Sequence, residues 1–393
     1  MTGSGVTAER VRSLVTGARA TGRRQDSGPE PEPVPEHGSH VAVLVKPEVM
    51  TGPGAAEALA AVVTALGRHG VRVLRGAVLP APEFAGRGRL LLHYPRLHRV
   101  AADGVPALDT RARRSLRGLP HPWGDGAPRP SGGSGDGDGP SGGYGDNGPS
   151  GGYGDNGPFG GYGGYGGYGG YGDSVLGAYE AMAHEPELTP RTLEERCREA
   201  GIHKLGSGSY ASPTEVNGRP VVVLNGFLPA LAAGYTAPEG LVGLLECHAD
   251  REIAGLRTEV LGALHPDSAH PDSLRGSLGT LARAQGIPLS EGRNGVHLSA
   301  GHLEAMFQVW RYFAAQDGRD TGATPFGRSL AARGVPPATA APLATDPGLP
   351  ADPGESADPG ETVSPHGATE HLARDAVLER VVRWTTGART VTA

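Results

Sequence analysis

Residue types that handle phosphate are concentrated between His265 and Phe313. This stretch contains Arg275 followed by a glycine, and the run GRNGVHLS, which includes His297 and ends at Ser299. A neutral imidazole is a good nucleophile at neutral pH, and positioned cations stabilise the charge that spreads over phosphoryl oxygens during transfer. The chain has 15 histidines, so a histidine alone does not mark a catalytic residue, and the surrounding motif has to carry the argument. No G-x-x-x-x-G-K-[S/T] run occurs, which excludes a P-loop.

In order and approximate spacing these motifs resemble the nucleoside diphosphate kinase family. That family has an active-site loop ending in Arg-Gly and a nucleophile within Gly-Arg-Asn-x-x-His-x-Ser, which here are residues 274–276 and 292–299. Residues 45–48, VKPE, resemble the family's Lys-Pro-Asp motif. The resemblance covers residues 39–100 and 217–316.

The resemblance implies a role for each matching residue. His297 would be the nucleophile that becomes phosphohistidine, with ATP as donor and a nucleoside diphosphate as acceptor. Magnesium would be the cofactor, held by the phosphates of the nucleotide, and no protein metal site is expected. The phosphate- and nucleotide-binding residues would be Lys46, Tyr94, Arg257, Arg275 and Asn294, with Asn294 on the ribose hydroxyl. Ser299 and Gln308 would support the histidine from behind.

Several positions depart from the family pattern. Leu264 stands in place of a threonine that touches phosphate, Leu298 in place of a glycine, and Gln308 in place of the glutamate that orients the histidine. An amide cannot stabilise an imidazolium as a carboxylate does, so we expect an altered or weakened enzyme, which Gln308→Glu would accelerate by about tenfold. A long Gly/Tyr-rich insertion separates the two matching parts of the chain. It falls where the family carries its aromatic platform for the nucleotide base.

Three alternatives remain open beside this interpretation. The chain could be a specialised kinase of another small molecule, or a catalytically weak nucleotide-binding module that recruits a partner. The tandem HPDSAHPDS could also be a metal cluster, although the resemblance makes it part of an active-site loop instead. Its ligands would be His265, Asp267, His270 and Asp272.

Composition narrows the class of protein. The 393 residues include 65 Gly and 35 Pro, so much of the chain is expected to be unfolded. The net charge of -6 gives no electrostatic footprint for nucleic acid. Two cysteines without a C-x-x-C spacing suggest neither disulfides nor zinc, and no segment resembles a signal peptide or a membrane span. We therefore expect a cytoplasmic protein without membrane partners, and a homo-oligomer is one candidate assembly.

Periodicity places the elements around these motifs. Strands are predicted at HVAVLVKP, VRVLRGAVL, RPVVVLNGF and GRNGVHLSA. Helices are predicted for residues 52–70, for TPRTLEERCREAG, for one or two helices within residues 237–264, and for GHLEAMFQVWRYFAAQ. A loop is expected from His265 to Glu291, and a small amphipathic helix near the C-terminus.

Together with the family resemblance, these elements predict an α/β fold of the α+β sandwich type. The expected core is a ferredoxin-like antiparallel sheet with helices on one face. Its two parts are residues 39–104 and 217–316, separated by an insertion at 105–216 that is Gly/Tyr-rich and disordered at 125–173. Residues 1–38, in which a short helix is one interpretation of the first residues, and the Pro/Ala/Asp-rich tail at 317–393 are expected to be disordered flanks, with order beginning near His40.

Overall fold

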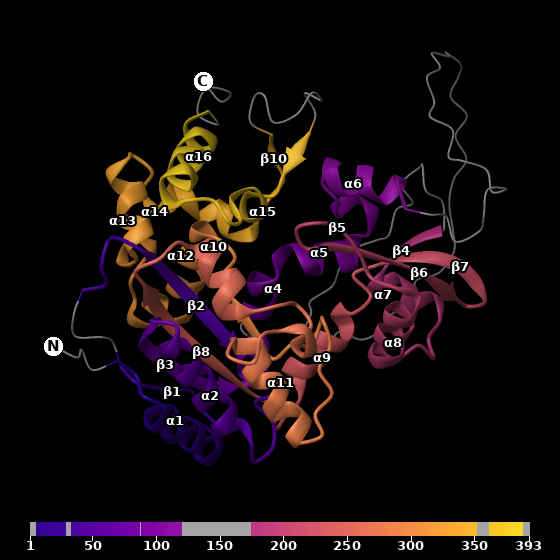
Figure 1. The fold of residues 1–393 in the computed structure, drawn as a ribbon. Coiled ribbons are helices and arrows are strands. Elements are labelled where there is room, and N and C mark those ends of the chain that lie inside the picture. Colours follow the sequence, from indigo (N-terminus) through magenta and orange to yellow (C-terminus); the bar gives the residue numbers. More distant parts are fainter. Residues whose placement is uncertain (1–4, 29–32, 87, 120–173, 352–360, 388–393) are drawn as a thin grey trace, which may run out of the picture.

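The computed structural model describes residues 5–28, 33–86, 88–119, 174–351 and 361–387. The part of the insertion predicted to be disordered, 125–173, lies outside these residues. Figure 1 shows a large sheet with helices, a smaller sheet to one side, and the C-terminal segment over one end of the large sheet.

The large sheet has five strands in the order β1-β3-β8-β2-β9, and every pairing is antiparallel. Apart from the short edge strand β1, the sheet contains β2, β3, β8 and β9 in chain order. Their order across the sheet, β3-β8-β2-β9, is that of the predicted ferredoxin-like sheet. The predicted α+β class is confirmed. The strands are β1 (Gln25–Asp26), β2 (Ser39–Val45), β3 (Arg72–Pro80), β8 (Leu241–Ala249) and β9 (Val296–Leu298).

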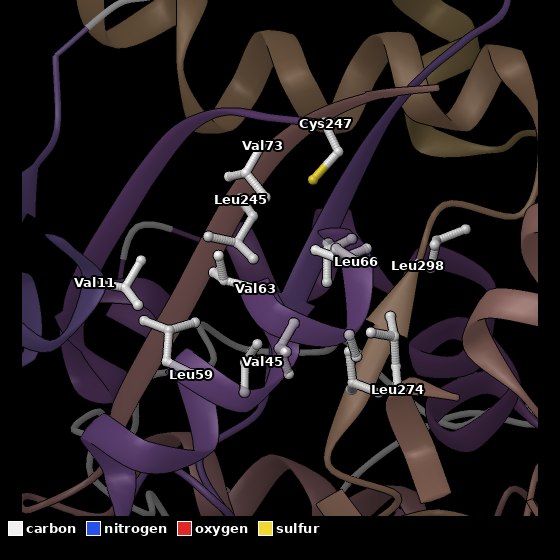
Figure 2. Close-up of a cluster of buried hydrophobic side chains, with 14 of the residues drawn as sticks. Val11, Val45, Leu59, Val63, Leu66, Val73, Leu245, Cys247, Leu274 and Leu298 are labelled. Atoms are coloured by element: carbon white, nitrogen blue, oxygen red, sulfur yellow. The ribbon is translucent and has the colours of Figure 1, made fainter. Parts of the chain in front are cut away.

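Both faces of this sheet are buried, so the expectation of helices on one face is wrong. Along β2, Val41, Val43 and Val45 point to one hydrophobic cluster, while Ala42 and Leu44 point to another. The first cluster lies between the sheet and the helices α1 (Ala8–Thr21), α2 (Ala55–Arg68) and α11 (Leu274–Ala284), and Figure 2 shows its side chains converging. Because both faces of β2 are buried, its sequence is apolar at consecutive positions rather than at alternate ones.

The strongest correction concerns β8, which we predicted as helix. The segment LVGLLECHA is the central strand, paired with β3 on one side and β2 on the other. A run that is apolar on both faces has no strand alternation, so periodicity cannot separate a fully buried strand from a buried helix. After β8, the rest of the segment predicted as helix contains α10 (Ile253–Gly255) and a π-helical turn, Leu256–Leu261.

The loop predicted from His265 to Glu291 is also interrupted by structure. Helix α11 runs through its middle, capped by Ser273, whose hydroxyl accepts a hydrogen bond from the backbone N–H of Gly276 at 3.2 Å. The helix predicted after the final strand is confirmed as α12 (His302–Tyr312). The Ser273 cap therefore fixes where α11, the helix that carries Arg275, begins.

The N-terminal segment is not a disordered flank. Helix α1 buries Val11, Leu14, Val15 and Ala18 against the sheet and α2. Order thus begins well before His40, because the apolar spacing of this helix gives it a face to bury.

The insertion contributes a lobe of its own. Four strands form a second sheet in the order β4-β7-β6-β5, in which β4 and β7 are parallel and the other pairs antiparallel. Strand β7, predicted as part of the main domain, belongs to this sheet, so the second part of the main domain begins after residue 217. The lobe's strands are β4 (Val175–Gly177), β5 (His203–Gly206), β6 (Ser209–Val216) and β7 (Arg219–Leu224). The helices between β3 and β8 are α3 (Ala81–Gly86), α4 (Arg89–His93), α5 (Pro95–Asp103), α6 (Thr110–Arg117), α7 (Ala178–His184), α8 (Pro190–Ala200) and α9 (Leu228–Thr236).

The C-terminal segment is also folded where it is described, contrary to expectation. A third cluster joins Leu303, Met306 and Phe307 of α12 to Val377 and Leu378 of the terminal helix, which confirms that helix. Within the described part of the chain, no helix is long and apolar enough to cross a bilayer. The segment contains α13 (Pro325–Ala332), α14 (Pro337–Ala340), β10 (Leu349–Pro350), β11 (Thr362–Val363), α15 (Pro365–Thr369) and α16 (Arg374–Gly387).

Candidate active site

His297 lies in the middle of β9, the edge strand beside β2. It is the register partner of Leu44, so its side chain lies on the sheet face that α12 covers. Its Nε2 is 3.0 Å from the Oε1 atom of Glu304, in the first turn of α12. The His297 side chain is 18 % exposed, enough for a ligand to reach the ring.

The charges of this pair set the tautomer of the histidine. Burial lowers the pKa of His297 below its ordinary value, against the opposing effect of Glu304. Burial alone would raise the pKa of Glu304, but the hydrogen bond and charge of His297 lower it to about 2. At neutral pH a neutral imidazole therefore donates its Nε2–H to a carboxylate. Nδ1 is left with a free lone pair, as a nucleophile requires.

Gln308 and Ser299 hold this pair in place. The Ser299 hydroxyl accepts a hydrogen bond from the Ala42 backbone N–H at 3.0 Å and donates to Oε1 of Gln308 at 2.7 Å. This orients the amide so that its Nε2 donates to Oε1 of Glu304 at 2.5 Å. The Gln308 amide also lies 3.3 Å from Nε2 of His297, because both nitrogens direct hydrogens to one carboxylate.

The structure thus supplies the carboxylate that the sequence comparison found missing. Gln308 occupies the expected position near the histidine, but Glu304, one helical turn earlier, makes the charged contact. The spacing of four residues on one helix places both side chains on the same face. The inference of a weakened enzyme from Gln308 loses its basis.

Lys46 and Asn294 are brought together directly after the end of β2. The Lys46 ammonium donates to Oδ1 of Asn294 at 2.8 Å and to the Gly292 carbonyl at 3.2 Å. Gly295, with a φ of 79°, forms the turn that returns the chain to β9 and accepts a hydrogen bond from the Lys46 backbone N–H. Burial, with the charges of Arg275 and Arg293, lowers the pKa of Lys46 to about 8, although Glu48 opposes this.

Two arginines add positive charge beside these groups. Arg275 donates from Nη1 to the carbonyls of Gly262 and Ala263, and burial and the charge of Arg257 lower its pKa to about 10. Arg257 donates to the Leu298 carbonyl at 3.1 Å and to the Glu370 carboxylate at 3.2 Å. The buried Nε atoms of both guanidinium groups have no partner among the described residues.

Tyr94 and its neighbour His93 pack against the His297 ring and line the same cavity. The Tyr94 ring lies 5.7 Å from the His297 ring, and the His93 ring lies 4.5 Å from it. Burial raises the pKa of Tyr94 well above its ordinary value, so its hydroxyl stays protonated.

These residues line one cavity with a volume of about 640 Å³. The predicted residues on its wall are Lys46, Tyr94, Arg257, Arg275, Asn294 and His297, while Ser299 and Gln308 lie behind the histidine. The inserted lobe and its connection to α9 add Tyr210 and Phe227, whose rings are 5.5 Å apart, and the C-terminal segment adds Glu370. Sequence reasoning missed Glu304, His93, Glu370 and the aromatic pair. Only Glu304 had a usable signal, an acid four residues before Gln308 on the same predicted helix.

The HPDS repeat does not assemble into a metal centre. Across the described ranges, no group of three or more His, Cys, Asp or Glu side chains could hold a metal ion. His265 and His270 each accept a hydrogen bond at Nδ1 from the backbone two residues on, at Asp267 and Asp272, so the repeat forms two local turns leading to α11.

The chain matches no family model, no curated protein and no solved structure.

Proposed function

We propose that the chain is a phosphotransferase of the nucleoside diphosphate kinase type, working through a phosphohistidine at His297. The observation that carries the proposal is the hydrogen bond of 3.0 Å from His297 to Glu304 at the wall of a cavity that Lys46, Arg257 and Arg275 also line. Phosphoryl transfer through a histidine requires at least a nucleophile with a fixed tautomer and several positioned cations.

The proposed first step uses Nδ1 of His297. Nδ1 attacks the γ-phosphorus of a nucleoside triphosphate while Nε2–H stays on Glu304, the P–N bond forms, and the bond from phosphorus to the β–γ bridging oxygen breaks, with its electrons leaving on the diphosphate. Glu304 stabilises the positive charge that develops on the ring. An acceptor diphosphate then takes the phosphoryl group through its terminal oxygen, restoring neutral His297.

The remaining residues bind and position. Lys46, Arg257 and Arg275 would face the phosphoryl oxygens, since the buried Nε–H groups of the two arginines have no acceptor within the described residues and suit oxygens of that kind. Tyr210 and Phe227 offer an apolar wall for the nucleoside in place of the family's platform. Magnesium would be bound by the nucleotide's phosphates and would neutralise part of their charge. We place this activity in the cytoplasm, where nucleotides are available.

The test is transfer of label from γ-labelled ATP. The wild-type protein with magnesium should acquire acid-labile, base-stable label, and unlabelled nucleoside diphosphates should remove it as labelled triphosphate. His297→Ala should acquire none, while its thermal midpoint stays near that of the wild type. Equal labelling of the variant would refute the nucleophile, and label that no diphosphate removes would redirect the search to another acceptor.

A further inference from the structure

His93 is a second histidine at the cavity that the proposed mechanism does not use. It ends α4, the residue is 3 % exposed, and its ring packs edge-on against that of His297 with centroids 4.5 Å apart. It lines the same cavity as Lys46 and Arg275. A histidine so close to the nucleophile calls for an explanation.

The neighbours of His93 determine which of its nitrogens carries the proton. Nδ1 lies 3.4 Å from the Gln308 amide nitrogen and within hydrogen-bond distance of the Tyr312 hydroxyl. Ser299 fixes the Gln308 amide so that this nitrogen is a donor. Nδ1 therefore acts as an acceptor, and Nε2 carries the hydrogen.

The ring is also uncharged. Burial, followed by the charges of His297, Arg311 and Lys46, lowers the pKa of His93 well below its ordinary value. A neutral imidazole with Nδ1 occupied has one donor left, Nε2–H, directed away from Gln308 and Tyr312. Within the described residues, this buried nitrogen has no hydrogen-bond partner.

A buried donor without a partner costs free energy, so a ligand atom is the natural acceptor. We propose that Nε2–H of His93 donates a hydrogen bond to an oxygen of the phosphoryl group that His297 receives. This inference rests on the proposed function. The proton stays on His93 throughout, and the hydrogen bond strengthens as negative charge builds on the phosphoryl oxygens, which makes His93 a catalytic residue of the transfer.

Two substitutions separate this role from a structural one. In His93→Asn the side-chain carbonyl can replace Nδ1 as the acceptor for Tyr312, but the distal donor is lost. In His93→Gln the amide N–H reaches about as far as Nε2, so the donor is retained. We expect His93→Asn to slow phosphoenzyme formation on the order of 10²-fold, the cost of one lost donor to developing charge, and His93→Gln to recover much of the rate.

His248→Asn is the matched control, because it removes a buried imidazole that does not line the cavity and leaves Nε2–H of His93 in place. It should keep most of the wild-type rate. If His93→Asn matches the wild type, or retains more activity than His93→Gln, His93 acts through Tyr312 and Gln308 and the proposal is wrong.

A measurement without transfer keeps the proposal testable if the proposed function fails. Nitrogen-15 spectra of the imidazoles should show His93 protonated at Nε2, and titration with inorganic phosphate should move that N–H signal downfield. A His93 protonated at Nδ1, or a signal that phosphate leaves unchanged, would overturn the inference. Failure of the proposed function is read separately, from wild-type protein that acquires no label.

Discussion

The hydrogen bond between His297 and Glu304 decides which ring nitrogen is free. Glu304→Gln keeps the shape of the side chain but removes the charge that would stabilise the phosphorylated ring of the proposed mechanism. We expect phosphoenzyme formation to slow by about 10 to 100-fold, as for other orienting carboxylates. Single-turnover labelling measures this, with Glu187→Gln, an exposed acid, as the control. A Glu304→Gln rate equal to the control's would show that the carboxylate does not act on His297.

The same contact reverses our expectation for Gln308. The Gln308 amide lies 2.5 Å from the Glu304 carboxylate, so Gln308→Glu would place two carboxylates side by side. Like charges at this distance share a proton and raise one pKa. We now expect slower phosphorylation and a lower thermal midpoint at neutral pH, both partly restored as the pH falls. A faster variant in single-turnover labelling would support the earlier assignment of Gln308 as a compromised substitute.

The lowered pKa of Lys46 predicts a pH dependence of nucleotide affinity. The ammonium is present below its pKa of about 8 and is lost as the pH rises through that value. ATP affinity should therefore be highest below pH 8 and fall above it, because a neutral amine no longer attracts phosphate. Calorimetric titration at several pH values measures this. Lys46→Met should bind weakly without the step, and a step that survives in this variant must come from another group.

At the scale of single elements, α11 depends on close packing at its first turn. A Cβ at Gly276 would lie 2.0 Å from the His270 carbonyl oxygen, so the helix can approach the preceding loop only with glycine there. Gly276→Ala should cost about 1 to 3 kcal/mol in the free energy of unfolding and displace Arg275. Denaturant unfolding and ATP affinity test both effects.

The control for this change is Gly67 of α2, where a Cβ would meet nothing within 4 Å. Gly67→Ala should leave the protein as stable or stabilise it by up to about 1 kcal/mol. If Gly276→Ala behaves like Gly67→Ala, the loop before α11 is free to move aside.

Local elements with strong patterns were predictable, and long-range ones were not. The strands β2 and β9 and the helices α2 and α12 follow from periodicity and turn residues. Strand β8 could not be predicted because its double burial depends on β2 and β3, which are distant in sequence. The motifs likewise identified the residues around His297 because those residues lie close together in the sequence. They missed Glu370 because its role depends on a contact with Arg257 113 residues away.

At the scale of the whole molecule, three parts of the chain build one cavity. The main sheet supplies His297 and Lys46, the inserted lobe supplies Tyr210, and the C-terminal segment supplies Glu370. The same segment covers the outer face of α12, whose other residues hold His297. A compositional prediction of disorder at 317–393 overlooked apolar residues that fit this helix.

The terminal helix should therefore contribute to global stability. Leu378 is fully buried against the helices of the third cluster. Leu378→Ala should lower the free energy of unfolding by about 2 to 5 kcal/mol, the range for a buried leucine. Glu379→Ala, on the exposed side of the same helix, should change it by less than about 0.5 kcal/mol. Similar unfolding curves for the two variants would show that α16 does not dock in solution.

The position of β2 between β8 and β9 has a consequence for synthesis on the ribosome. Val45 pairs with Gly243 and Val296, so both neighbours of this strand are made long after it. Roughly 200 residues at about 5 to 20 residues per second leave β2 without either partner for on the order of 10 to 40 s. An apolar strand exposed for that long is vulnerable to pairing with other nascent chains. The chain should depend on chaperones for its yield more than its final stability suggests, and slower translation should lower that yield because it lengthens the exposure of β2.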